Sequence, residues 1–188
     1  MNEFKPLHWW KNPHWQTIWP SLFRQVVPAQ LPQEIRLNTP DGDFIDTDYY
    51  TQELAHTLVI LCHGLEGSSR RGYSLGMTNA LLKAGYEVFA WNYRSCSGVP
   101  NHTLKFYHSG ATEDLQLVVD YCRQKFAKRM ALLGCSMGGN LILKFLGEGR
   151  SSSQLSGIEA AVAYSVPCDL KECSYQLAKK RNRLYMNH

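Results

Sequence analysis

The sequence contains no long apolar segment. None of its runs approaches the roughly 18 to 20 apolar residues that a membrane-spanning helix requires. Residues 1–6 lack the continuous apolar stretch of a signal peptide. Internal repeats, low-complexity tracts and nucleic-acid-binding motifs are also absent. We therefore expect a cytoplasmic protein that has no transmembrane segment and binds no nucleic acid.

Neither sign of charge is in large excess, and paired-cysteine motifs are missing. The 20 basic and 16 acidic residues give a net charge of +4. Much of it lies in a late cluster, Lys171 with residues 179–183, which is typical of a solvated helix face. None of the six cysteines forms a C-x-x-C motif, and several lie in apolar runs. We therefore expect buried free thiols and a reducing compartment.

The apolar sequence that is present suits one globular α/β domain. Of the 188 residues, 44% are hydrophobic, which is enough for one buried core. Strands that are apolar on both faces, separated by helices, predict a mostly parallel sheet with helices on both faces. The expected strands are 57–62, 87–92, 130–133 and 160–166, and the expected helices are 75–84, 112–126 and 139–146, with Thr112 as the N-cap of the second helix.

The N-terminal part differs in composition from the rest. Residues 1–33 combine four tryptophans with five prolines, which predicts an irregular arm with short helical pieces. We interpret the tryptophans as packing anchors on the core rather than as a ligand or membrane site. Residues 34–37 and 44–50 are expected to form a hairpin that opens the core domain, residues 34–188.

One motif carries chemistry: Gly134-Cys135-Ser136-Met137-Gly138 lies between an expected strand and an expected helix. A G-x-S-x-G turn in this setting is typical of a nucleophile elbow, in which a strained serine projects above a sheet. A serine that attacks a carbonyl also requires backbone N–H donors for the developing oxyanion. We nominate the N–H of Met137, at a helix start, and the N–H of Leu65, in the loop 63–67 (HGLEG) after an earlier strand. His63 precedes the nucleophile, so we expect it to shape this loop rather than to act as the base.

Further segments resemble one known family, the AB hydrolase 4 family of the α/β-hydrolase superfamily. The matching segments are 12–17 (NPHWQT), 19–24 (WPSLFR), 63–67, 92–94 (NYR), 96–98 (CSG), 107–110 (YHSG) with Thr112 and Asp114, the elbow, and 166–170 (VPCDL) without its cysteine. The resemblance implies a serine esterase or lipase acting on small-molecule or lipid esters without a metal or organic cofactor. It implies that Ser136 is the nucleophile and that Leu65 and Met137 donate to the oxyanion. Spacing gives Tyr93, Arg94 and residues 107–109 no chemical role, and we expect them to brace the loops around the serine.

The chain departs from this family after the elbow, where 52 residues follow Ser136. Family members continue through further strands that supply an acid and a histidine, so we expect a C-terminally truncated, N-terminal portion of the α/β-hydrolase fold. Within the chain, Asp169 and His188 are the acid and base candidates in the right order. The strand at 160–166 would then be an exposed sheet edge.

Three functional hypotheses remain open. The first is a carboxylic ester hydrolase that acts through Ser136. The second is a catalytically silent fragment or scaffold of the same fold. The third is an acyltransferase, which would use an identical serine elbow.

Overall fold

The computed structural model describes residues 11–180 and residue 182. In this part of the chain a six-stranded sheet has the order β1-β2-β4-β3-β5-β6. The strands are β1 Gln33–Asn38, β2 Phe44–Tyr50, β3 Thr57–Cys62, β4 Glu87–Trp91, β5 Arg129–Cys135 and β6 Ile158–Tyr164. The helices are α1 Pro13–Phe23, α2 Gly72–Lys83, α3 Thr112–Phe126, α4 Met137–Gly147, α5 Ser152–Leu155 and α6 Leu170–Leu177.

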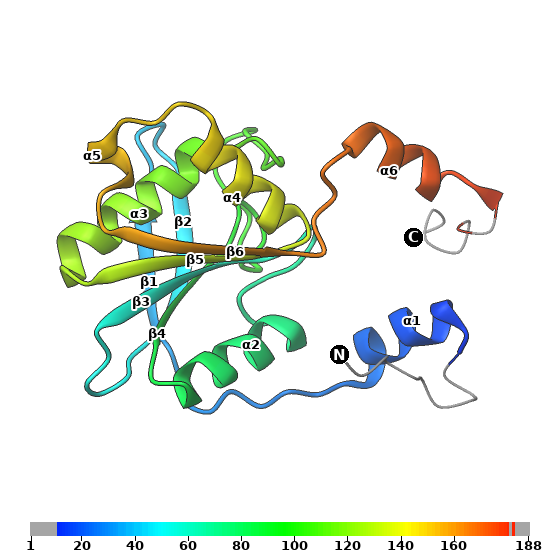
Figure 1. Ribbon diagram of the computed structural model, residues 1–188, viewed down its shortest axis with the longest axis horizontal. Helices are drawn as coiled ribbons and strands as arrows, with labels where there is room; N and C mark the ends of the chain where they lie inside the picture. Colours follow the sequence, from blue (N-terminus) through cyan, green and yellow to red (C-terminus); the bar gives the residue numbers. More distant parts are fainter. Residues whose placement is uncertain (1–10, 181, 183–188) are drawn as a thin grey trace.

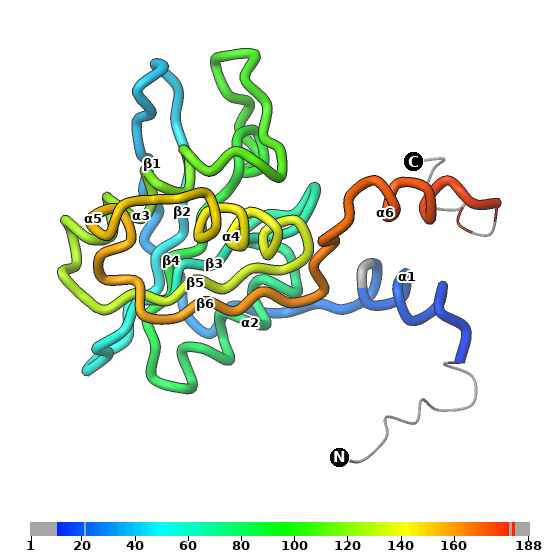
Figure 2. Tube along the Cα trace, turned by 45° about the horizontal axis from the view of Figure 1, so that its top comes forward, coloured from blue at the N-terminus to red at the C-terminus, as the bar shows by residue number. Residues whose placement is uncertain are grey.

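The sheet is mostly parallel and is covered on both faces, as the sequence predicts. Strands β4, β3, β5 and β6 pair in parallel, whereas β1 and β2 form an antiparallel hairpin whose second strand pairs with β4. Figure 1 shows α3 and α4 on one face of the sheet and α2 on the other. Helices α1 and α6 lie beyond one side of this three-layer body in both Figure 1 and Figure 2.

The two faces of β3 explain why its sequence is apolar from Leu58 to Cys62. Successive side chains of a strand point to opposite faces of the sheet. Accordingly, Leu58 and Ile60 join the core cluster that includes residues of α3 and α4. Val59 and Leu61 join the cluster that includes Leu82 of α2. Between two helical layers, the buried positions 58–62 of the strand are therefore all apolar, and the one polar residue, Thr57, lies at its half-buried start.

Strand β6 is the last strand of the sheet, as expected for an exposed edge. Its residues are exposed or half-buried along the whole strand. Within the described residues, no helix has both the length and the apolar character needed to cross a bilayer.

The structure corrects three sequence-based expectations. Thr112 is not the N-cap of α3. Ala111 holds that position and has no side-chain cap. The Gly110 carbonyl accepts the Thr112 N–H at 2.9 Å, and this turn places Thr112 inside the helix. The cysteines are free, but only Cys62 and Cys122 are buried, since the others lie in loops, at the C-terminal end of β5 or in α6.

The third correction concerns the tryptophans of the N-terminal arm. Trp9 and Trp10 lie outside the described residues. Trp15 and Trp19 are 54% and 43% exposed. Their rings stack along α1 itself, with centroids 6.3 Å apart, and Trp19 lies 4.4 Å from the Phe23 ring. This i, i+4 spacing brings the rings together on one face of α1, so they stabilise the helix locally and do not serve as anchors on the core.

Candidate active site

Ser136 occupies a sharp turn between β5 and α4. Its backbone has φ of 52° and ψ of −118°, in the half of conformational space that non-glycine residues rarely adopt. Hydrogen bonds hold this conformation from two sides: the Ser136 N–H donates to the Tyr164 carbonyl and the Ser136 carbonyl accepts from the Asn140 N–H, both at 3.0 Å. Strain of this kind costs about 1–3 kcal/mol and persists where the surroundings enforce it, often at functional sites.

The flanking glycines permit direct backbone contact between the elements of this turn. A Cβ atom at Gly134 would lie 2.5–2.6 Å from backbone atoms of Gly138 and Gly139. A Cβ atom at Gly138 would lie 2.6 Å from the carbonyl oxygen of His63 and would overlap that of Cys62. The start of α4 therefore packs against the end of β3, which a side chain at either position would prevent.

The loop 63–67 lies beside the serine, as the proposed pairing of donor loop and elbow requires. A Cβ atom at Gly64 would be 3.4 Å from the Ser136 Cβ. Met137 is the first residue of α4, so its N–H belongs to the unpaired first turn of a helix and is favourable for negative charge. Among the described residues, neither the Leu65 N–H nor the Met137 N–H has a hydrogen-bond acceptor. Both amides remain able to donate to a substrate oxygen.

His63 has the structural role expected from its position. Its ring is buried, with Nδ1 2.7 Å from the Gly64 carbonyl oxygen and Nε2 3.2 Å from the Tyr93 N–H. Because Nε2 accepts that amide proton, Nδ1 carries the ring proton and donates to Gly64. Burial lowers the pKa of His63 to about 4, so the ring is neutral at pH 7. With both nitrogens engaged by the backbone, His63 is unsuited to serve as the base for Ser136.

The structure gives the acid candidate, Asp169, a different role. The Asp169 side chain is exposed and accepts the Glu172 N–H at 2.9 Å, so it serves as the N-cap of α6. His188 lies outside the described residues. The link from the elbow to this segment is a hydrogen bond from the Asn140 side chain to the Pro167 carbonyl, at 3.2 Å.

Of the residues expected to brace the loops around the serine, Arg94 instead joins the β1–β2 turn to the start of α3. Arg94 is buried and binds Asp114 through two nitrogens at 2.8 and 2.9 Å. It also lies 2.9 Å from Asp41 and 3.5 Å from Asp43, in the turn between β1 and β2. This ion cluster ties the hairpin turn to the start of α3. Burial favours a raised pKa for Asp43, but hydrogen bonds from Thr103 and Asn101 hold it well below its usual range.

Two tyrosine hydroxyls accept backbone N–H groups of the donor loop, and only Tyr107 of this pair lies in a segment that the sequence motifs marked. The Tyr107 hydroxyl accepts the Glu66 N–H at 3.1 Å, and its segment was expected to brace the site. The Tyr73 hydroxyl accepts the Gly64 N–H at 2.8 Å. Tyr73 lies in the first turn of α2 with no motif around it, so no signal in the sequence distinguishes it from a surface aromatic.

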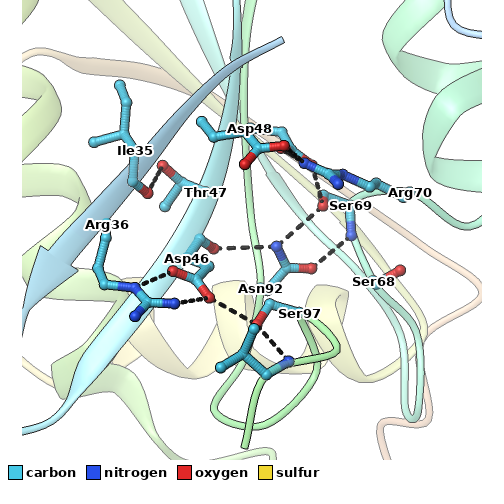
Figure 3. Close-up of a pocket in the computed structure, with 12 residues that line it drawn as sticks. Ile35, Arg36, Asp46, Thr47, Asp48, Ser68, Ser69, Arg70, Asn92 and Ser97 are labelled. Atoms are coloured by element: carbon cyan, nitrogen blue, oxygen red, sulfur yellow. Dashed lines mark hydrogen bonds and ion pairs between the residues drawn. The ribbon is translucent and has the colours of Figure 1, made fainter. Parts of the chain in front are cut away.

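Two cavities lie next to residues that flank or form the donor loop. A cavity of about 410 Å³ lies between the β1–β2 hairpin and residues 68–70 (Figure 3). Its charged groups pair internally: Arg36 binds Asp46 at 2.7 Å, and Arg70 binds Asp48 at 2.7 Å and Glu34 at 2.5 Å. Another cavity, of about 390 Å³, is lined by Leu65, Gly67 and Tyr73. Ser136 lines neither, and the described residues contain no cluster of three or more potential metal ligands.

Comparison with known proteins places this geometry in context. The model of the family Hydrolase_4, described as serine aminopeptidase, S33, matches residues 54–187. The candidate esterase YheT of Escherichia coli (strain K12) is 35% identical over 190 residues, covering 99% of this chain and 55% of its own length. The phospholipase ABHD3 of Mus musculus is 30% identical over 186 residues, covering 93% of this chain and 44% of its own. The monoacylglycerol lipase of Saccharomyces cerevisiae is 31% identical over 152 residues, covering 80% of this chain and 32% of its own length.

Solved structures show the same fold. The Pyrococcus furiosus esterase Pf2001 superposes with a TM-score of 0.63 at 24% identity, covering 82% of this chain and 60% of its own. XC6422 from Xanthomonas campestris gives a TM-score of 0.61 at 21% identity, covering 78% of this chain and 66% of its own. It is described as an α/β serine hydrolase without a lid. The chain spans about half the length, or less, of the curated relatives described above.

Proposed function

Because the chain belongs to the Hydrolase_4 family of the α/β-hydrolase superfamily, we propose that it carries the nucleophile and oxyanion donors of a carboxylic ester hydrolase. The observation that supports this most directly is the strained backbone of Ser136 at the β5–α4 turn. The esterase, phospholipase and lipase names of similar proteins support an ester as the substrate. Small-molecule and lipid esters both fit this proposal.

In the proposed mechanism the Ser136 hydroxyl oxygen attacks the ester carbonyl carbon while a base takes its proton. The carbonyl oxygen becomes an oxyanion, which the N–H groups of Leu65 and Met137 stabilise. One such donor is typically worth about 3–4 kcal/mol. The intermediate collapses to an acyl-serine, and the leaving alcohol receives the proton from the base. Water then releases the acid by the reverse sequence, and the chemistry requires no metal or organic cofactor.

We propose none of the described residues as the base. His63 is neutral, buried and bound to backbone at both nitrogens. Asp169 with His188 is the pair within this chain, although the Asp169 carboxylate already caps α6. The longer relatives contain additional sequence that can supply an acid and a histidine.

A fluorophosphonate probe, which reacts with activated serines, tests the nucleophile. We expect labelling of the parent chain and of Ser153→Ala, an exposed serine in α5, but not of Ser136→Ala. Labelling that persists in Ser136→Ala would show that another residue is the nucleophile. Asp169→Asn and His188→Ala then test the acid and base: unchanged labelling in both excludes this pair.

The silent-scaffold alternative makes a different prediction for the same chain. It predicts no labelling and no p-nitrophenyl acetate turnover above the Ser136→Ala control. A chimaera in which the C-terminal half of YheT continues this chain would then distinguish the hydrolase hypothesis from the scaffold hypothesis. Ser136-dependent labelling of the chimaera supports a competent elbow that lacks its base, whereas no labelling of a folded chimaera favours the scaffold.

A further inference from the structure

The donor loop is held by side chains from two other parts of the chain, α2 and the 107–110 segment, and this arrangement identifies residues that control its geometry. We propose that Tyr73 and Tyr107 are positioning residues that fix the direction of the Leu65 N–H toward the oxyanion. This inference rests on the proposed function of Leu65 as a donor. It goes further because it says that two hydroxyl groups orient that donor. Neither hydroxyl forms or breaks a bond in the reaction.

The two phenols bind the amides on either side of Leu65. The Gly64 N–H donates to the Tyr73 hydroxyl at 2.8 Å, and the Glu66 N–H donates to the Tyr107 hydroxyl at 3.1 Å. The Leu65 N–H between them has no acceptor among the described residues. Two of three successive amides are therefore occupied, and the one that is left belongs to the nominated oxyanion donor.

The Gly64–Leu65 peptide group is fixed at its other end. Its carbonyl oxygen, on Gly64, accepts from the Gly67 N–H at 3.1 Å and from His63 Nδ1 at 2.7 Å. In a planar trans peptide the C=O and N–H point in opposite directions. Holding the Gly64 oxygen on the His63 side therefore directs the Leu65 N–H to the opposite side of the loop.

The loop requires such restraint because part of its backbone is strained. Glu66 has a positive φ of 53°, which is uncommon for a residue with a side chain. Its N–H is the group that Tyr107 binds, so this hydrogen bond stabilises the strained conformation directly. Without it, rotation of the Leu65–Glu66 peptide would relieve the strain and turn the neighbouring N–H groups.

Tyr107 is packed as a rigid support, whereas Tyr73, 39% exposed, reaches the loop through its hydroxyl. Tyr107 is 7% exposed and stacks on Tyr93 with ring centroids 5.3 Å apart, and Tyr93 in turn meets the His63 ring edge-on at 4.3 Å. The Tyr73 hydroxyl would be 3.7 Å from a Cβ at Gly64, the same point that lies 3.4 Å from the Ser136 Cβ. The supports therefore reach from α2 and from the 107–110 segment to the immediate surroundings of the serine.

Backbone dynamics test this proposal without requiring turnover. We would measure the ¹⁵N order parameter of the Leu65 amide in the parent chain, Tyr73→Phe, Tyr107→Phe and the double variant. We expect about 0.85 in the parent and below about 0.6 in the double variant. Tyr50→Phe, which removes a hydroxyl buried in β2 away from the loop, is the matched control and should match the parent.

Circular dichroism establishes that each variant is folded, and the single variants decide the test if the double variant unfolds. An unchanged Leu65 order parameter in folded Tyr73→Phe and Tyr107→Phe overturns the proposal. Because this measurement does not depend on Ser136, a silent chain leaves it intact. The failure of the proposed function and the failure of this inference are thus distinguishable.

A second readout separates positioning from general stability in any form that turns over substrate. Thionoester sulfur accepts hydrogen bonds more weakly than ester oxygen, so thionoester turnover depends less on the oxyanion donors. We expect Tyr107→Phe to lower kcat on the ester about tenfold, less than the 10²–10³-fold loss of a whole donor. Thionoester turnover should fall much less. Equal losses on both substrates would indicate a purely structural role and contradict the proposal.

Discussion

Replacing Gly138 with alanine tests whether the start of α4 packs directly on the backbone at the end of β3. The new Cβ would lie 2.6 Å from the His63 carbonyl oxygen and closer still to that of Cys62. Non-bonded heavy atoms are comfortable near about 3.5 Å, so the helix and strand must separate by about 1 Å. Because both obstacles are backbone atoms, no side-chain rotation can relieve the overlap.

The magnitude follows from two opposing terms. Overpacking a well-packed interior costs about 1–3 kcal/mol, whereas alanine in place of glycine within a helix gains about 0.5–1 kcal/mol. With carbonyl oxygens of two residues in the way, we expect a net loss of about 2 kcal/mol in the free energy of unfolding. Gly147→Ala is the matched control in the same helix: this glycine is exposed with nothing within 4 Å of its Cβ position. We expect it to stabilise the chain by about 0.5 kcal/mol.

Urea unfolding followed by circular dichroism measures both variants. With an unchanged m-value, the two midpoints should move in opposite directions and differ by the equivalent of about 2.5 kcal/mol. If Gly138→Ala unfolds at or above the midpoint of Gly147→Ala, the close backbone packing at the elbow is refuted.

Three further predictions concern stability at the same site. His63 titrates near pH 6.5 when unfolded and near 4 when folded, so the unfolded chain binds more protons between these values. The free energy of unfolding should therefore fall by up to about 3 kcal/mol as the pH drops from 6.5 to 4, a dependence that His63→Gln should lose and His102→Gln should keep. Ser136→Gly should raise the free energy of unfolding by about 1 kcal/mol while abolishing probe labelling, since glycine tolerates the positive φ; a destabilised variant would contradict the strain argument. Arg94→Met should cost about 3–5 kcal/mol in urea unfolding because Asp114 and Asp43 stay buried without a cation, and adding Asp114→Asn should recover part of the loss.

The local pattern of the sequence was sufficient for most of the element boundaries. β3 spans residues 57–62 and α3 spans 112–126, both as predicted. Strand β6 starts two residues before the expected position, and α2 begins at Gly72 rather than Leu75. The earlier start of α2 has a physical cause. The first turn of the helix presents Tyr73 to the donor loop, where its hydroxyl binds the Gly64 N–H. This contact holds the first turn, and no apolar periodicity in the sequence marks that turn.

The sequence by itself determined the α/β class and the serine turn. These depend on local chemistry: apolar runs buried on both faces, and glycines where backbone approaches backbone. Only the tertiary structure decided that His63 is neutral with both ring nitrogens bound, and that Tyr73 and Tyr107 hold the loop beside Ser136. The two tyrosine contacts join residues that are 9 and 41 positions apart in the sequence. They can form only after the sheet has brought the ends of its strands together.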